Sequence, residues 1–253
     1  MSRPMSFLAA LAMLLLAGPA HAAELKVLTA GALRQVVLAL APVFEQRTGD
    51  RLVVDNDTAG GLVRRIAGGE AFDLAILPPR GIDELADSGR VATASKRVVA
   101  RTGVGVLVAE GTPRPDISTV DALRRALLEA RSIAYIDPAA GGSSGVISSQ
   151  LMQRLGIAEQ VKAKTVLVPG GLVAERVTAG EAQLGLQQIS EILTMKCVVL
   201  VGPLPDAVQS YTSYAAVISA TARQPAAAQA FIGLITGADG AAAMRRSGLE
   251  PAP

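Results

Sequence analysis

The sequence predicts an α/β fold in which strands and helices alternate. The first observation is the stretch 25–66, where a strand-like run at 25–29 precedes a helical pattern, a strand at 51–54 and a second helical pattern. The second observation is that the same alternation continues to the end of the chain. This order is typical of parallel strands joined by right-handed crossovers. The strand ends then meet at one sheet edge, where such folds bind ligands.

Apolar spacing and turn residues predict each element in order. In the first helix, apolar residues recur three and four positions apart from Val36 to Phe44, and Gly49 is the predicted C-cap. Ser118 or Thr119 is the predicted N-cap of a later helix. The further strands are predicted at 72–77, 97–109, 133–136, 166–168, 182–186, 198–201 and 211–220, and the further helices at 83–88, 119–130, 146–155, 172–180, 225–235 and 238–247.

Residues 1–22 have the composition of an export signal. Arg3 supplies a positive start, 7–17 are apolar, and Ala20-His21-Ala22 matches a cleavage site for small residues. The apolar run is too short for a transmembrane span. A buried N-terminal helix, the alternative, does not explain why charge, apolar core and small residues come in this order. We therefore expect a periplasmic, soluble protein cleaved near Ala22, with about 230 residues left to form a large core.

Composition excludes several classes of function. Removing the signal also removes His21, the only histidine, and leaves Cys197 as the only cysteine. Histidine-based hydrolytic triads and zinc sites with histidine ligands are thereby excluded. Cys197 begins an apolar run, so we expect it to be buried in a strand and not to act as a nucleophile. The net charge of +2 is dispersed and aromatic residues make up 3%, which disfavours nucleic-acid binding.

Three motifs carry a resemblance to a known family. They are 28–33 (Leu-Thr-Ala-Gly-Ala-Leu), 44–49 (Phe-Glu-Gln-Arg-Thr-Gly) and 59–66 (Ala-Gly-Gly-Leu-Val-Arg-Arg-Ile). These motifs resemble the start of the periplasmic molybdate-binding proteins, which are solute receptors of ABC importers. A further likeness lies at 231–251.

The resemblance implies a type 2 periplasmic binding protein. Such a protein has two doubly wound α/β lobes joined by a two-segment hinge, with the ligand in the cleft between them. Lobe 1 would comprise 23–100 plus 213–253, and lobe 2 would comprise 101–212. Closure would be a hinge motion near 98–105 and 202–214. The implied partners are a small anionic ligand and an ABC permease in the inner membrane, and the protein is expected to be a monomer.

Loops of small residues follow several predicted strands and would face this cleft. Small residues let main-chain N–H groups approach a ligand, and helix N-termini favour an anion. The predicted ligand-binding residues are Thr29, Ala30, Gly31, Ala32, Thr58, Ala59, Gly60, Arg80, Gly142, Ser143, Ser144, Gly170, Gly171, Gln187 and Gln188. Taken singly, each loop could be an ordinary turn, and Thr58 or Ser143 could be an N-cap. No cofactor or metal is expected, and a cleft lined by acidic side chains would contradict the proposal.

Arginine and glutamine side chains have alternative interpretations. Arg80 could clamp an anion, although an arginine after two prolines is more often solvated. Arg34, Arg64 and Arg65 are expected on solvated helix faces. One of Gln187 and Gln188 must face away from the cleft if their strand alternates.

The sequence departs from the family at residues that matter for the ligand. The resemblance places the serines of molybdate binders at Ala32 and Ala59, and the tyrosine of the second lobe at Gln187 or Gln188. Each lost hydrogen bond to a charged group costs about 1.5–3 kcal/mol, so two would weaken oxyanion binding by a factor on the order of 100 to 10,000. A small organic acid is therefore at least as good a candidate as a molybdate-like oxyanion.

Three functions remain open from the sequence. The first is an exported receptor that delivers a small anion to an ABC permease, and the second is a sensing module with the same cleft. The third is a periplasmic hydrolase or lyase with Asp137 as base, although an Asp-Pro pair after a strand more often begins a turn. Because the mature chain lacks histidine and an activated cysteine, we predict that the protein is not an enzyme.

Overall fold

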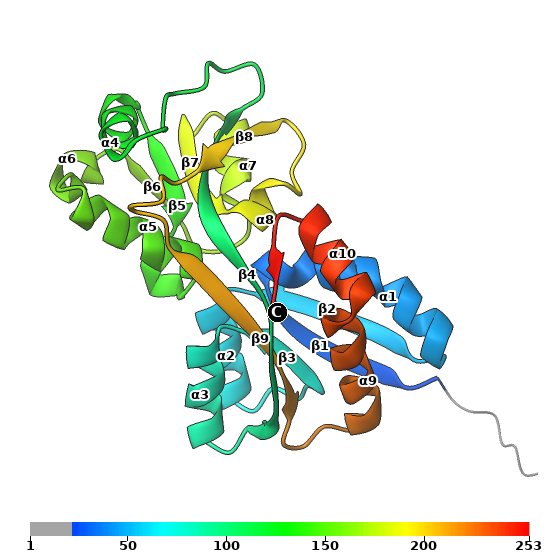
Figure 1. Cartoon of the computed structure of the whole chain (residues 1–253). Coiled ribbons are helices and arrows are strands. Elements are labelled where there is room, and N and C mark those ends of the chain that lie inside the picture. The colour runs from blue at the N-terminus through cyan, green and yellow to red at the C-terminus, as the bar shows by residue number, and fades with distance from the viewer. Residues whose placement is uncertain (1–21, 253) are drawn as a thin grey trace, which may run out of the picture.

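The computed structural model describes residues 22–252 as an α/β protein built on one ten-stranded mixed sheet (Figure 1). The predicted signal, 1–22, lies outside the described residues except for its last position. The strands are β1 (Glu24–Ala30), β2 (Arg51–Asp57), β3 (Leu74–Leu77), β4 (Val91–Ala109), β5 (Ile133–Ile136), β6 (Thr165–Val168), β7 (Leu184–Gln188), β8 (Val198–Pro203), β9 (Tyr211–Ser219) and β10 (Glu250–Pro251). The helices are α1 (Arg34–Thr48), α2 (Ala59–Ala67), α3 (Pro79–Asp87), α4 (Val120–Glu129), α5 (Ser143–Arg154), α6 (Ala158–Lys162), α7 (Val173–Thr178), α8 (Ile189–Ile192), α9 (Pro225–Thr236) and α10 (Ala238–Arg246).

The first lobe is a sheet with helices on both faces. Its strand order is β2-β1-β3-β9, where β1 pairs in parallel with β2 and β3 and β9 runs antiparallel. On one face α1, α9 and α10 pack into a cluster in which Phe44 and Phe231 meet edge to face, 5.4 Å apart. On the other face α2 and α3 contribute Leu62, Ile66 and Ile82. The parallel pairing predicted for 25–66 is confirmed, and it places the N-termini of α1 and α2 at one sheet edge.

The second lobe repeats this arrangement with different strands. Its strand order is β4-β7-β5-β6, where β5 pairs in parallel with both β6 and β7. Helices α4, α5 and α6 cover one face, and α7 and α8 cover the other, as Leu127, Leu151 and Val173 illustrate. The carboxyl ends of β5 and β7 therefore lead into α5 and α8 on the side that faces the first lobe (Figure 1).

Strands β4 and β9 connect the lobes. The 19-residue β4 pairs with β9 up to Gly103 and with β7 and β8 beyond it. At this point the Gln209 side chain pairs with the main chain of Val104, accepting from its N–H at 3.1 Å and donating to its carbonyl at 2.9 Å. Each hydrophobic cluster lies wholly on one side of this crossing. The lobe boundaries proposed from the sequence stay a prediction.

Several details differ from the sequence prediction. Helices α6 and α8 and strand β10 were not predicted, and α5 begins at Ser143 instead of Val146. Cys197 is exposed in the turn before β8, with a left-handed φ of 66°, so its predicted burial in a strand is wrong. Strand β8 begins one residue later, at Val198, and Cys197 belongs to the turn that precedes it. Within 22–252 no helix is both long and apolar enough to cross a membrane.

Candidate functional site

A cavity of about 290 Å³ lies between the two lobes. This is close to the size of a small-molecule site. Its walls come from the loops after β1 and β2 in the first lobe, and from the loop after β5, the loop before α7 and helix α8 in the second. The lining residues are Ala30, Gly31, Ala32, Arg34, Gln35, Asn56, Asp57, Thr58, Ala59, Ile136, Gly142, Ser143, Ser144, Gly171, Leu172, Gln188, Glu191, Thr194 and Tyr214.

Thr58 holds the first-lobe wall against the second lobe. It is the N-cap of α2, where its hydroxyl accepts from the Gly61 N–H at 3.0 Å. The same hydroxyl donates to the Ala140 carbonyl, which belongs to the second lobe, at 2.7 Å. Its one proton is therefore already used. Thr58 contributes to closure of the cleft and is not a free donor for a ligand.

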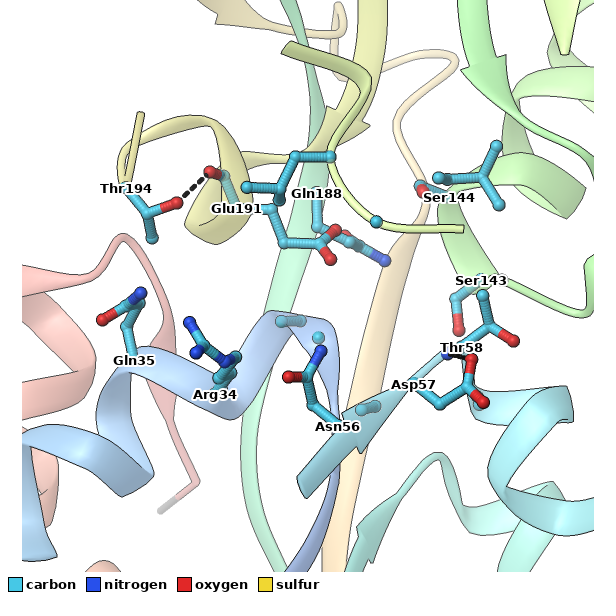
Figure 2. A pocket seen from close by; sticks show the side chains of 18 of the residues that line it. Arg34, Gln35, Asn56, Asp57, Thr58, Ser143, Ser144, Gln188, Glu191 and Thr194 are labelled. Carbon is cyan, nitrogen blue, oxygen red and sulfur yellow. Dashed lines mark hydrogen bonds between the residues drawn. The ribbon is translucent and has the colours of Figure 1, made fainter. Parts of the chain in front are cut away.

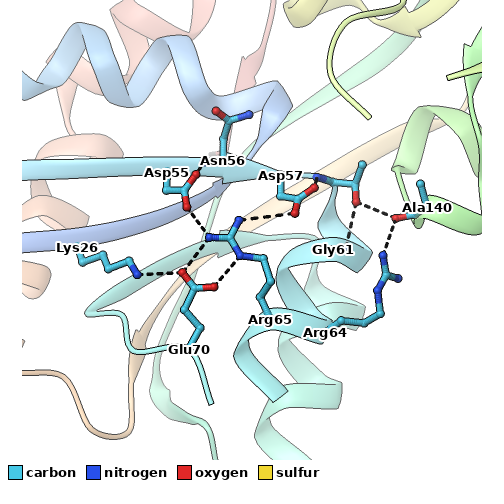
Figure 3. Close-up of polar contacts among 10 residues, drawn as sticks. Lys26, Asp55, Asn56, Asp57, Gly61, Arg64, Arg65, Glu70 and Ala140 are labelled. Carbon is cyan, nitrogen blue, oxygen red and sulfur yellow. Dashed lines mark hydrogen bonds and ion pairs between the residues drawn. The ribbon is translucent and has the colours of Figure 1, made fainter. Parts of the chain in front are cut away.

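An ionic network supports the end of β2 behind this wall (Figure 3). The Arg65 guanidinium contacts Asp55, lies 2.6 Å from Glu70 and 3.6 Å from Asp57, while Lys26 lies 2.9 Å from Glu70. Hydrogen bonds from Arg65 and Lys26 lower the pKa of Glu70 to about 2. Arg65 and Lys26 thus hold the end of β2 that precedes Thr58, through Asp55, Asp57 and Glu70. The Asp57 carboxylate therefore lies beside the positive charge of Arg65.

The N-terminus of α5 forms the opposite wall. Gly142 is its N-cap and offers no side-chain bond, so the first N–H groups at Ser143 and Ser144 have no side-chain cap within the described part of the chain. Gly145 allows the helix to start this close to the sheet, since a Cβ there would lie against the Ile136 carbonyl. Both serines line the cavity (Figure 2). This helix end favours negative charge, such as a carboxylate group.

Glu191 brings a carboxyl group into the same cavity. It lies on α8, partly buried, and faces Arg34 and Asn56 from the other side (Figure 2). Its Oε1 lies directly over Gly31, where any Cβ would collide with it. Burial raises the pKa of Glu191 to about 7, and hydrogen bonds involving Gln187 and the Gln188 main chain oppose this rise. The group can therefore hold or release a proton near neutral pH.

Tyr214 completes the polar surroundings of Glu191. It is 2% exposed on β9, and its hydroxyl lies near Ser143, Thr212 and Gln188. Burial, together with the charge of Glu191, raises the pKa of Tyr214 above its ordinary range. The phenol therefore stays protonated and can act as a donor toward the cavity.

Gln188 presents a buried polar atom to the cavity. Its Nε2 donates to Thr212 Oγ1 at 2.9 Å, whereas its Oε1 is buried without a hydrogen-bond partner among residues 22–252. Because the Thr212 hydroxyl can either donate or accept, the amide can turn over and place Nε2 where Oε1 now lies. Gln188 can thus offer a ligand either a donor or an acceptor.

Ten of the predicted ligand-binding residues line the cavity: Ala30, Gly31, Ala32, Thr58, Ala59, Gly142, Ser143, Ser144, Gly171 and Gln188. Five do not: Thr29, Gly60, Arg80, Gly170 and Gln187. Each of these five residues has a structural reason for lying outside the cavity, and the set of residues that bind a ligand stays a prediction.

The main chain and the sheet account for these exclusions. Thr29 is fully buried in β1, and its hydroxyl donates to the Ala30 carbonyl. The Gly60 N–H donates to the Gly141 carbonyl. Gly170 does not line the cavity, whereas its neighbour Gly171 does. Gln187 points away from Gln188 and accepts from the Val173 N–H at 2.8 Å.

Arg80 is excluded because it is solvated. Its side chain is 92% exposed at the start of α3 and lies 3.2 Å from Glu84, one helical turn away. Arg34 is exposed, as the sequence predicted, and it also lines the cavity. It makes no ion pair within the described part of the chain.

Other functional residues escaped the sequence argument. Glu191 was missed because α8 has four residues and too short a periodic pattern to predict. Its position three residues after the predicted Gln188 was the available signal, since a strand end leading into a helix is where cleft residues arise. Glu191 also means that the cavity is not lined by neutral donors alone. Between 22 and 252, no three His, Cys, Asp or Glu residues form a group that could hold a metal ion.

Comparison with known proteins extends this picture. Residues 25–250 match the family described as bacterial extracellular solute-binding protein. The chain is 33% identical over 251 residues to a Pseudomonas protein named aconitate isomerase, covering 96% of this chain and 95% of that protein. It is 27% identical over 181 residues to the molybdate-binding protein ModA of Azotobacter vinelandii, covering 70% and 69% respectively.

A solved structure shows the same fold. The periplasmic molybdate-binding protein of Azotobacter vinelandii matches with a TM-score of 0.77 and 21% identity, over 89% of this chain and 98% of that chain. Together these matches confirm the resemblance to the molybdate-binding proteins and the two-lobed α/β fold.

The prediction that the protein is not an enzyme is wrong. The Pseudomonas protein that matches nearly the whole chain is named an isomerase. The absence of histidine and of an activated cysteine excluded only mechanisms that need those residues. A carboxyl group with a raised pKa can transfer a proton without either.

Proposed function

Because the chain belongs to the bacterial extracellular solute-binding protein family, we propose that it uses the interlobe cleft to bind a small unsaturated polycarboxylate and to isomerise it by proton transfer. Aconitate is the proposed substrate, from the name of the relative that is 33% identical. The proposal places the protein outside the inner membrane as an exported protein, in line with the sequence of its first 22 residues.

The observation that carries the proposal is the Glu191 carboxyl group, which faces the cavity with a pKa of about 7. Aconitate has a methylene group next to a carbon–carbon double bond. Glu191 as carboxylate would take a proton from the methylene carbon, and the electron pair would delocalise into the double bond and a carboxylate. Returning the proton to the former vinyl carbon moves the double bond and completes isomerisation. A base whose pKa lies near the working pH suits both transfers.

Other cavity residues support the charge that develops in this reaction. The intermediate carries extra negative charge on a carboxylate, and the uncapped N–H groups at Ser143 and Ser144 and the Tyr214 hydroxyl are donors that can stabilise it. Arg34, at the other side of the cavity, can pair with a second carboxylate. These contacts would hold the substrate with its methylene carbon toward Glu191.

A second candidate function is capture of an organic anion for an ABC permease, without turnover. The family match favours it, and so do the hydrogen bonds that close the cleft, such as Thr58 to Ala140. The two functions use the same cavity and differ in whether Glu191 exchanges a proton with the ligand.

The test is to incubate the purified mature protein with cis-aconitate in D₂O and to follow the products by NMR. We expect trans-aconitate, with deuterium entering at the carbon that exchanges a proton. Glu191→Gln should lower the rate at least 100-fold, because proton transfer by a positioned group contributes about 10²–10⁴. Glu175→Gln, which removes the same charge from an exposed position on α7, is the matched control and should retain the rate.

Other outcomes decide between the two candidates. Binding of cis-aconitate by calorimetry without conversion or deuterium uptake would contradict the isomerase and support the receptor. Conversion that survives in Glu191→Gln would remove Glu191 from the mechanism.

A further inference from the structure

The carboxyl group of Glu191 occupies the place where the first loop of the cleft could receive an anion. Its Oε1 stands over the main chain of Gly31, at the turn that leads into α1. A side chain at position 31 would displace the carboxyl group from this place. The helix N-terminus that would attract an external oxyanion is therefore already faced by a negative group of the protein itself when Glu191 is ionised.

The charges around Glu191 do not cancel this negative group. Tyr214, on β9, stays protonated and therefore carries no charge. Asp57, on β2, is a second carboxylate in the cavity wall, and the Arg65 guanidinium lies 3.6 Å from it. Arg34 is the cation that lines the cavity. A tetrahedral dianion would meet two carboxylates and one guanidinium. Like charges in a partly buried cavity repel more strongly than they do in bulk water, so this arrangement disfavours a dianion.

Hydrogen bonding also disfavours fully ionised oxyanions. Molybdate and sulfate at neutral pH carry no proton, so their oxygens and those of an ionised Glu191 would face one another as acceptors. A substrate that turns a C–H or O–H group toward Glu191 avoids this contact. Its own carboxylates can lie at the N-terminus of α5 and near Arg34 instead.

We propose that Glu191 is a specificity-determining residue that excludes fully ionised tetrahedral oxyanions from the cleft and admits ligands with a hydrogen atom to present to it. This inference rests on the proposed use of the cavity as the ligand site, but it does not depend on turnover. It also explains how a fold shared with molybdate-binding proteins can serve a different class of ligand: one carboxyl group faces the loop where Ala32 already lacks a hydroxyl.

The test measures oxyanion binding by calorimetry at pH 8 with sulfate and with molybdate. Glu191→Gln keeps the shape of the side chain, and we expect it to bind at least one of the two oxyanions at least tenfold more tightly than the wild type does. Glu175→Gln, the exposed control, should bind like the wild type. Equal affinity in the wild type and Glu191→Gln would overturn the inference.

A second measurement needs no variant at position 191. Sulfate stays a dianion between pH 8 and pH 6, so wild-type affinity for sulfate should rise as Glu191 becomes protonated through this range. The rise should persist in Asp57→Asn, which removes the other carboxylate of the cavity. A sulfate affinity that stays constant over this range would show that Glu191 does not exclude sulfate. A rise that Asp57→Asn abolishes would show that Asp57, and not Glu191, excludes it.

The results separate this inference from the proposed function. If the wild type does not isomerise cis-aconitate but Glu191→Gln gains oxyanion binding, the isomerase fails and the specificity role stands. If the wild type isomerises cis-aconitate and Glu191→Gln gains no oxyanion binding, the specificity role fails and the isomerase stands.

Discussion

The Gly60 N–H donates to the Gly141 carbonyl at 3.0 Å, so main chains of the two lobes touch without side chains between them. Beside this contact the Ala140 carbonyl accepts from the Thr58 hydroxyl at 2.7 Å and from Arg64 at 3.4 Å. The structure is therefore a closed form, in which the loop after β5 rests on the N-terminus of α2.

Gly60→Ala should disfavour the closed form. A Cβ at this position would lie 2.8 Å from the Gly141 Cα, and main chain cannot yield as a flexible side chain can. We expect the variant to have a larger radius of gyration than the wild type in small-angle X-ray scattering. Gly233→Ala is the control, since a Cβ there meets nothing within 4 Å. A Gly60→Ala scattering curve identical to that of the wild type would show that the contact does not hold the lobes.

Thr58→Val should weaken both folding and closure, because one hydroxyl serves both. Loss of an N-cap destabilises by about 0.5–2 kcal/mol in urea unfolding, and loss of the bond to Ala140 should also expand the molecule. Thr119→Val removes an equivalent cap from α4, far from the cleft, and should reproduce the loss of stability without the expansion. Thr58→Ser should behave as the wild type in both measurements.

Glu191 should make stability depend on pH near neutrality. Its pKa in the folded protein, about 7, is above the ordinary value of 4.5, so the folded state keeps the proton that the unfolded state has lost. The stabilisation is complete below about pH 4.5 and is lost as pH rises through about 7. Relative to Glu191→Gln, the free energy of unfolding of the wild type should fall by about 2–4 kcal/mol over this range. Urea unfolding at a series of pH values measures it, and a constant difference would contradict the raised pKa.

Glu70 should have the opposite pH dependence. Its pKa is lowered to about 2, so its stabilisation is present above about pH 4.5 and is lost as pH falls toward 2. With side chains 22–36% exposed, Glu70→Gln should cost about 1–2 kcal/mol at pH 7 and little near pH 2. Glu159→Gln, which breaks an exposed pair at 3.8 Å with Lys162, should cost less than about 0.5 kcal/mol. Equal losses in the two variants would show that the network adds nothing.

The order of the fold could be predicted from local patterns. Apolar spacing placed α1, Gly49 formed the predicted C-cap, and the alternation of strand and helix brought the loops at Gly31, Thr58 and Ser143 to one cleft. These features depend on neighbours in sequence, which is why a linear pattern contains them. Short elements such as α8 lack enough residues for a periodic signal, and Glu191 was missed with it.

The sequence by itself determined the α/β class and several of the loops that border the cleft, because period and turn chemistry are local properties, but it also placed Arg80 there, which lies outside the cavity. It also showed that one of Gln187 and Gln188 had to face away, since side chains on a strand alternate. Only the tertiary structure decided that Gln188 faces the cavity, that the Thr58 hydroxyl is used by Ala140, and that Glu191 lies over Gly31. These facts arise where two lobes meet, and contacts between residues far apart in the chain leave no periodic trace in the sequence.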